Sequence, residues 1–251
     1  MISVVALLLA ILLPGISRAR RQSVAVSCLS RLHQWAIIFS NYTNANNYTF
    51  HTREIGTPWG YKRMWMYVYE PYYSDPEMRC CPAATNLRLS KGSFCVWAGQ
   101  GSDWGWGGDW DPNKGIYGSY GMNRFAVNIV GDWPPKKYCW RRTDIKGSNE
   151  IPVFMDCIYP AISPSSGDQP PPFEGARDGG EQMQFACVNR HSGFVNSVFL
   201  DFSVRKVGLK ELWILKWSRG WDKCGPWTKC GGVTSDDWDE AAKWMKGFPE
   251  Y

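Results

Sequence analysis

The first 42 residues constrain the fold of this chain more than any other stretch. Residues 1–17 (MISVVALLLAILLPGIS) carry no charge and are almost wholly apolar, a composition typical of a segment that prefers lipid to water. From Val24 onward, apolar residues recur at steps of three and four, which places them on one face of a helix. This stripe comprises Val24, Cys28, Leu32, Trp35, Phe39 and Tyr42. The two patterns predict one long helix that faces lipid at its start and needs a globular partner at its end.

We divide the chain accordingly into residues 1–23, the apolar membrane-anchor half of the helix, and residues 24–251, a globular head that includes the amphipathic half. Pro14 lies inside the apolar run, where it removes a helix hydrogen bond and should bend the helix. The anchor half presents Val4, Leu7, Leu8, Ile11, Leu12, Pro14 and Ile16. The residues expected to dock the helix on the head are Cys28, Leu32, Trp35 and Phe39.

Two segments carry a resemblance to a known family. Residues 9–34 (LAILLPGISRARRQSVAVSCLSRLHQ) resemble the start of type IV pilin-like proteins, in particular the pseudopilin-type family. The segment from His191 to Asp201 (HSGFVNSVFLD) is similar to that family's motif of a histidine, nine residues and Asp-Gly. This chain departs from the family pattern because Phe202 replaces the glycine, and because the Gly-Phe cleavage site and the glutamate after it are absent. Seventeen helical residues reach about 25 Å, short of the roughly 30 Å hydrocarbon layer, so we expect the natural start upstream of Met1.

Together with the strands and helices described below, the resemblance implies an α+β fold. The long N-terminal helix would pack on an antiparallel β-sheet head with long loops and short C-terminal helices. The resemblance further implies a single-pass inner-membrane precursor with its head in the periplasm or in an extracellular filament. Such a subunit assembles with homologous pilin or pseudopilin subunits through a type II secretion or type IV pilus machinery. Positive residues follow the apolar run and none precede it, which alone would favour a cytoplasmic head; a basic leader upstream would restore export.

The nine cysteines leave two interpretations open. In an exported head several of them pair as disulfides, whereas in the cytosol they are small buried hydrophobes or metal ligands. No Cys-x-x-Cys is present, so zinc-site spacing is missing. We expect export, with a local disulfide between Cys224 and Cys230 and a longer one between Cys157 and Cys187. The net charge of +5 is too small to indicate nucleic-acid binding.

Residues 97–121 (WAGQGSDWGWGGDWDPNKGIYGSYG) are rich in glycine and tryptophan, which predicts a long ordered loop. Asp109, Asp111 and Asn113 alternate like the first ligands of a calcium loop. Lys114 and Tyr120 stand where that loop requires its glycine and its bidentate carboxylate, so turn capping by the carboxylates is the favoured alternative to calcium. Trp104, Trp106 and Trp110 suit sugar stacking, with burial of the rings in the head as the alternative.

Several shorter patterns predict the remaining elements. Residues 151–159 read as a buried strand, 125–130 as another strand, and 195–200 with 203–207 as a hairpin. Phe202 replaces the turn glycine, so we expect a longer or differently typed turn in which the Phe202 ring is packed. Residues 64–69 fit a strand or a short helix, and 160–181 form a proline-rich excursion. Residues 208–219 form a short helix, and a capping box at Thr234 and Asp237 opens another.

The sequence contains few patterns typical of catalytic or metal-binding sites. Nine residues of strand would separate His191 from Asp201 by about 30 Å, so we expect His191 to anchor the hairpin to the head rather than to form a dyad. No nucleophile elbow, phosphate loop or paired metal-binding histidines occur. The sequence therefore favours a structural pilin-like subunit without enzymatic activity or cofactor. The alternative is a membrane-anchored carbohydrate-binding module that uses residues 97–121.

Overall fold

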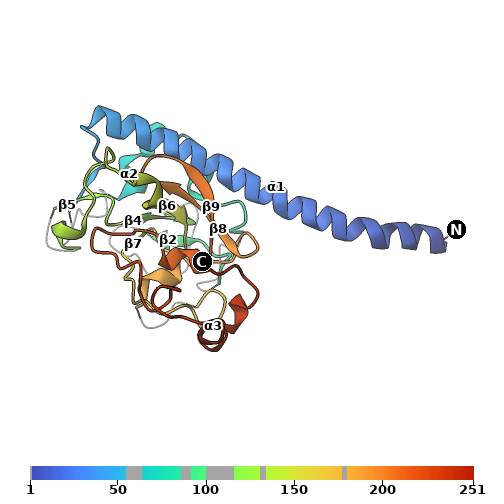
Figure 1. The fold of residues 1–251 in the computed structure, drawn as a ribbon. Helices are drawn as coiled ribbons and strands as arrows, with labels where there is room; N and C mark the ends of the chain where they lie inside the picture. Colours follow the sequence, from blue (N-terminus) through green and yellow to red (C-terminus); the bar gives the residue numbers. More distant parts are fainter. Residues whose placement is uncertain (1, 55–63, 86–91, 100–115, 131–133, 177–179) are drawn as a thin grey trace.

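The computed structural model describes residues 2–54, 64–85, 92–99, 116–130, 134–176 and 180–251, and their side chains except those of residues 2–11, 53–54, 98–99 and 129–130. The fold is α+β, with one long N-terminal helix, a five-stranded mixed sheet and short helices near the C-terminus (Figure 1). This architecture confirms the predicted fold class at that level. Within the described part of the chain, no helix combines the length and hydropathy required to cross a bilayer.

Helix α1 (Ile2–Ala45) is continuous for 44 residues and runs through Pro14. Side chains 12–23 are exposed, and from Val24 onward one face of the helix is buried. Figure 1 shows the first half of α1 extending away from the head and the second half lying across it. The helix ends where Asn46 Nδ2 donates to the Tyr42 carbonyl and Asn47 adopts a φ of 54°, a left-handed conformation that asparagine tolerates.

The central sheet has the strand order β7-β4-β6-β8-β9. Its strands are β4 (Tyr120–Asn123), β6 (Pro152–Asp156), β7 (Ala161–Ile162), β8 (Phe194–Phe199) and β9 (Val204–Gly208). The predicted antiparallel sheet is wrong at one edge, because β7 pairs parallel to β4. The chain reverses between β6 and β7, so β7 runs opposite to β6 and therefore parallel to β4, which is itself antiparallel to β6.

The β8–β9 hairpin matches the predicted pair of strands, with residues 200–203 as its turn. Phe202 adopts a φ of 65° and its ring packs against the core under α1. The packing offsets a conformation that is sterically costly for a bulky residue. Asp201 is exposed and its Oδ1 accepts hydrogen bonds from the backbone N–H and the hydroxyl of Ser203.

Short elements surround the sheet, and some differ from the prediction. Residues 64–69 contain helix α2 (Trp65–Val68), and the stretch predicted as a loop contains the paired strands β2 (Trp97–Gly99) and β3 (Ile116–Gly118). The strand predicted over 125–130 is only β5 (Asn128–Val130), parallel to β1 (Thr52–Glu54). Helix α3 (Ser235–Ala241) has the predicted capping box. The predicted helix over 208–219 is wrong, since that stretch forms only a 3-10 turn, η7 (Lys210–Trp213). The other 3-10 turns of the described residues are η2 (Glu70–Tyr72), η3 (Pro76–Arg79), η4 (Lys136–Tyr138), η5 (Ser148–Glu150), η6 (Gln182–Phe185) and η8 (Lys243–Met245).

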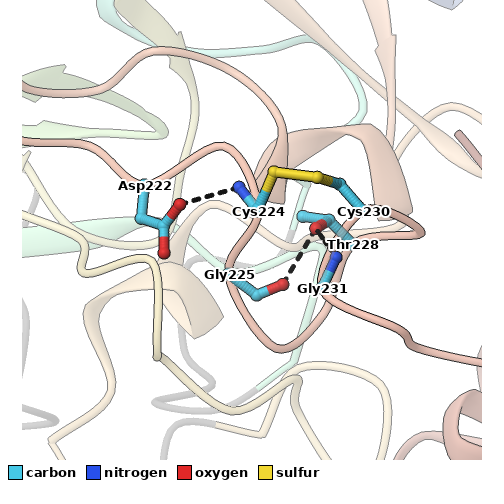
Figure 2. Close-up of a disulfide and its surroundings, with 6 residues drawn as sticks. All are labelled: Asp222, Cys224, Gly225, Thr228, Cys230 and Gly231. Carbon is cyan, nitrogen blue, oxygen red and sulfur yellow. Dashed lines mark hydrogen bonds between the residues drawn. A yellow bond between two sulfur atoms is a disulfide. The ribbon is translucent and has the colours of Figure 1, made fainter.

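The disulfide between Cys224 and Cys230 is present and closes a loop braced by its own polar groups (Figure 2). Asp222 accepts from the Cys224 N–H, and the Thr228 hydroxyl donates to the Gly225 carbonyl. The predicted bridge between Cys157 and Cys187 is wrong, since both thiols are free and buried. Cys187 Sγ contacts Met245 Sδ at 3.9 Å, whereas Cys157 directly follows β6 and lies close to Gly121.

Candidate functional site

The seam between α1 and the head is an aromatic interface centred on Trp35. Trp35 is fully buried, and its indole N–H donates to the Met78 carbonyl at 2.6 Å. The ring contacts Trp65 edge-on at 5.1 Å and Phe154 at 5.3 Å between centroids, distances at which aromatic pairs attract beyond simple burial. Cys28, Leu32 and Phe39 are also fully buried along this seam. The helix is therefore part of the hydrophobic core of the head.

A polar cluster lies at the N-terminal end of this docked helical segment. It consists of Cys28 from α1, Cys81 after η3, Asp156 at the end of β6, and His191 before β8. All four are buried, and one donor atom from each lies within 4.8 Å of the others. We call these four residues the junction cluster.

Short contacts connect the members of the junction cluster. His191 Nε2 lies 3.2 Å from Asp156 Oδ2 and 3.4 Å from Cys81 Sγ. Cys28 Sγ lies 3.7 Å from both carboxylate oxygens of Asp156 and 3.3 Å from the hydroxyl of Tyr120. The contacts of Cys28 join α1 directly to β4 and β6, and those of His191 join β6 to Cys81.

Arg190 supports the cluster from the head side. Its guanidinium is fully buried and lies 3.4 Å from Asp156 Oδ1. It also donates to the carbonyl oxygens of Ser93, Ser119, Cys95 and Cys157. A buried charge is tolerated when it is paired and hydrogen-bonded, and the planar fork of arginine satisfies both conditions here.

The Asp156–His191 pair is ionised. Burial by itself would raise the pKa of Asp156 and lower that of His191, but their mutual attraction and hydrogen bond outweigh burial. The pKa of Asp156 falls to about 2 and that of His191 rises to about 10. Burial raises the pKa of Cys81 well above its ordinary value. The Cys81 thiol is therefore protonated at neutral pH and is a poor nucleophile.

The structure separates the two ends of the predicted His191–Asp201 motif. His191 is buried against Asp156, whereas Asp201 is exposed in the hairpin turn and bonds to Ser203. Their roles are thus distinct: His191 links the segment before β8 to β6 and Cys81, and Asp201 shapes the turn. The carboxylate partner of His191 is Asp156, which stands at the end of the predicted buried strand.

The other predicted site residues fall into two groups. Leu12 and Ile16 are exposed on α1, and Cys28, Leu32, Trp35 and Phe39 are buried at the seam. The side chains of Val4, Leu7, Leu8 and Ile11 lie outside the described set, as do all of Trp104, Trp106, Trp110, Asp109, Asp111 and Asn113. The calcium and sugar-binding interpretations of residues 97–121 therefore rest on the sequence alone.

Sequence reasoning did not identify Cys81, Asp156 and Arg190 as members of one site. Cys81 lies 110 residues from His191, and Cys28 lies 128 residues from Asp156, so no motif spacing could connect them. The useful signals were a cysteine on the apolar stripe of α1 and an acidic residue at the end of a wholly apolar strand. A charged residue in such a buried strand needs a partner.

Comparison with known proteins gave no match to a protein-family model, to a curated protein or to a solved structure.

Proposed function

We propose that this chain is a structural, pilin-like subunit of a filament. The first half of α1 would anchor it in the inner membrane and then pack against the same helix of neighbouring subunits. The observation that carries the proposal is the change in burial along α1. Side chains 12–23 are exposed, whereas Cys28, Leu32, Trp35 and Phe39 of the stripe belong to the core of the head.

Exposed apolar side chains on the projecting half of α1 support this proposal. Leu12 is 55% exposed, and Leu13 and Ile16 are each 61% exposed. Clustered apolar side chains on a surface mark contacts with lipid or with another protein. Arg18, Arg20 and Arg21 follow them and are exposed as well, as expected for basic residues at the edge of a lipid layer.

The geometry of α1 also suits assembly into an open polymer. A helix that projects from one side of a head offers different surfaces at its two ends, and such heterologous contacts give helical filaments when the rotation does not close. The proposed partners would contact this helix. They are homologous subunits and a secretion or pilus assembly machinery.

Membrane fractionation and cysteine cross-linking of the full chain test the proposal. A variant carrying Leu12→Cys and Arg20→Cys places two exposed thiols on the projecting half of α1. We expect the chain to fractionate with membranes and, on mild oxidation, to form a ladder of species larger than dimers, because each subunit contacts two neighbours. The native free cysteines are buried and should contribute little to cross-linking.

A matched pair of substitutions provides the control. Ile16→Asp places a charge on the projecting half of α1, whereas Phe173→Asp places one on the head at a side chain that is 52% exposed. We expect Ile16→Asp to weaken membrane association and to abolish the ladder, and Phe173→Asp to leave both unchanged. A wild-type chain that fractionates as a soluble protein, together with a Leu12→Cys/Arg20→Cys variant that forms no species larger than a dimer, would refute the proposal.

A further inference from the structure

We propose that the junction cluster is a structural zinc site, in which Cys28, Cys81, Asp156 and His191 hold one Zn²⁺ between α1 and the head. The inference is independent of filament formation, since it concerns how the helix is fastened within one chain. Its basis is the identity, spacing and charge of four buried side chains.

The donor set is one that zinc uses. Structural zinc sites are four-coordinate and take thiolate sulfur, imidazole nitrogen and carboxylate oxygen as ligands. The junction cluster supplies two sulfurs, one nitrogen and one carboxylate, all buried and all within 4.8 Å of one another. Because the four protein ligands would complete the coordination shell, the site would be closed and structural rather than open and catalytic.

Three of the six separations between donor atoms lie close to the edges of a zinc tetrahedron. Zn–S bonds near 2.3 Å and Zn–N or Zn–O bonds near 2.0–2.1 Å give edges of about 3.5 Å for sulfur to nitrogen or oxygen, and about 3.3 Å for nitrogen to oxygen. The observed edges are 3.4 Å from Cys81 Sγ to His191 Nε2, 3.7 Å from Cys28 Sγ to Asp156, and 3.2 Å from His191 Nε2 to Asp156 Oδ2. The other three separations are no longer than 4.8 Å, so side-chain adjustments would bring all four donors around one zinc ion.

The charges of the site also balance when zinc is bound. Thiolates at Cys28 and Cys81 and the carboxylate of Asp156 carry three negative charges. Zn²⁺ and the buried guanidinium of Arg190 carry three positive charges, and His191 is a neutral ligand. Binding releases the thiol protons and any proton on the imidazole to solvent. The zinc centre then carries one net negative charge, which balances the positive charge of the fully buried Arg190.

Hydrogen bonds from neighbouring residues orient the side chains that would bind zinc. The Tyr120 hydroxyl lies 3.3 Å from Cys28 Sγ, Arg190 pairs with Asp156 Oδ1, and the Asn196 N–H donates to Asp156 Oδ2 at 2.9 Å. The Cys81 backbone N–H donates to the Ser119 hydroxyl at 2.6 Å. Contacts of this kind orient metal ligands and tune their affinity, and their loss weakens binding about 10–100-fold.

Metal analysis of the full chain, purified without an affinity tag in mild detergent, tests the site. We expect one zinc ion per chain, and a fall in Tm of roughly 10 °C when a strong chelator removes it. Replacement by Co²⁺ should give the intense visible bands of a tetrahedral site together with thiolate-to-cobalt charge transfer. Cys28→Ser should lose the metal, Tyr120→Phe should bind it at least tenfold more weakly, and Cys28→His should keep it with an altered Co²⁺ spectrum.

Cys187→Ser is the matched control, because Cys187 is another fully buried thiol that lies outside the junction cluster, with its sulfur 3.9 Å from Met245 Sδ. It should retain one zinc and an unchanged Co²⁺ spectrum. The proposal is overturned if wild type and Cys187→Ser neither contain zinc nor take up Co²⁺. It is equally overturned if peptide mapping finds Cys28 and Cys81 joined as a disulfide in the native chain, or if Cys28→Ser binds metal as tightly as wild type.

Discussion

At the scale of single residues, Asp168 connects the proline-rich excursion to the C-terminal core. Its Oδ2 accepts from the Met183 N–H at 2.8 Å, and its carbonyl accepts from the Trp213 indole at the same distance. Burial raises the pKa of this carboxyl to about 6, with a further contribution from the nearby Glu181. Because the pKa is higher in the folded chain than its ordinary 3.8, the folded state binds the proton more tightly than the unfolded state does.

The raised pKa predicts a stability change with pH. The contribution of Asp168 is most favourable below about pH 4 and declines as pH rises to about 6, since deprotonation then favours the unfolded chain. Asp168→Asn keeps an oxygen acceptor for Met183 and removes the charge. We expect it to raise the free energy of unfolding by about 1–2 kcal/mol at pH 8 and by less at pH 4, as measured by urea unfolding.

The exposed Glu240 supplies the control for this experiment. Glu240→Gln also removes one negative charge and should change the free energy of unfolding by less than about 0.5 kcal/mol at both pH values. Equal effects of Asp168→Asn at pH 4 and pH 8 would show that the Asp168 carboxyl does not titrate between them.

At the scale of elements, α1 has two faces of opposite character over its second half. Trp35 is fully buried among aromatic rings, whereas Ile37, two residues later, is 61% exposed. Helical stability in proteins comes mainly from packing of the apolar face rather than from intrinsic propensity. The buried stripe should therefore dominate the energetics of this element.

Alanine substitutions on the two faces test that difference. Trp35→Ala removes the seam's central ring and leaves the Met78 carbonyl without its indole donor, so we expect a loss of about 3–5 kcal/mol in the free energy of unfolding. Ile37→Ala should cost less than about 0.5 kcal/mol. Both variants introduce alanine, which has the highest helix propensity. The difference between their free energies of unfolding, measured in urea, therefore reports the packing of the two original side chains. Similar losses for the two variants would contradict the assigned faces.

At the scale of the whole molecule, the head includes only the second half of α1. The hydroxyl of Ser17 bonds to the Pro14 carbonyl within the same helix, and side chains 12–23 are exposed. We therefore expect deletion of residues 2–20 to leave the Tm of the head within about 2 °C of the full chain. The measurement is thermal unfolding followed by circular dichroism.

A longer deletion shows that the test is sensitive. Removal of residues 2–36 also removes Cys28, Leu32 and Trp35, and should prevent cooperative unfolding because the sheet face under α1 loses its cover. If the short deletion lowered the Tm by 10 °C or more, the projecting half would be part of the folded head, and its assignment as an intermolecular surface would fail.

The sequence by itself determined the features that depend on local pattern. The apolar stripe from Val24 to Tyr42, the buried run containing β6, the β8–β9 hairpin and the Thr234 capping box each follow from side-chain period or from bonds between near neighbours. The residue type of Phe202 also predicted a packed ring in the turn. In each case the information lies within a few residues of the element.

Only the tertiary structure decided the features that join distant segments. Residues 157–160 turn the chain so that β7 lies parallel to β4, and Cys157 and Cys187 end in different surroundings. The junction cluster gathers Cys28, Cys81, Asp156 and His191 from four segments. Such gathering follows from how α1, the sheet and the loops pack together, and no periodicity within any one segment records where the other segments will lie.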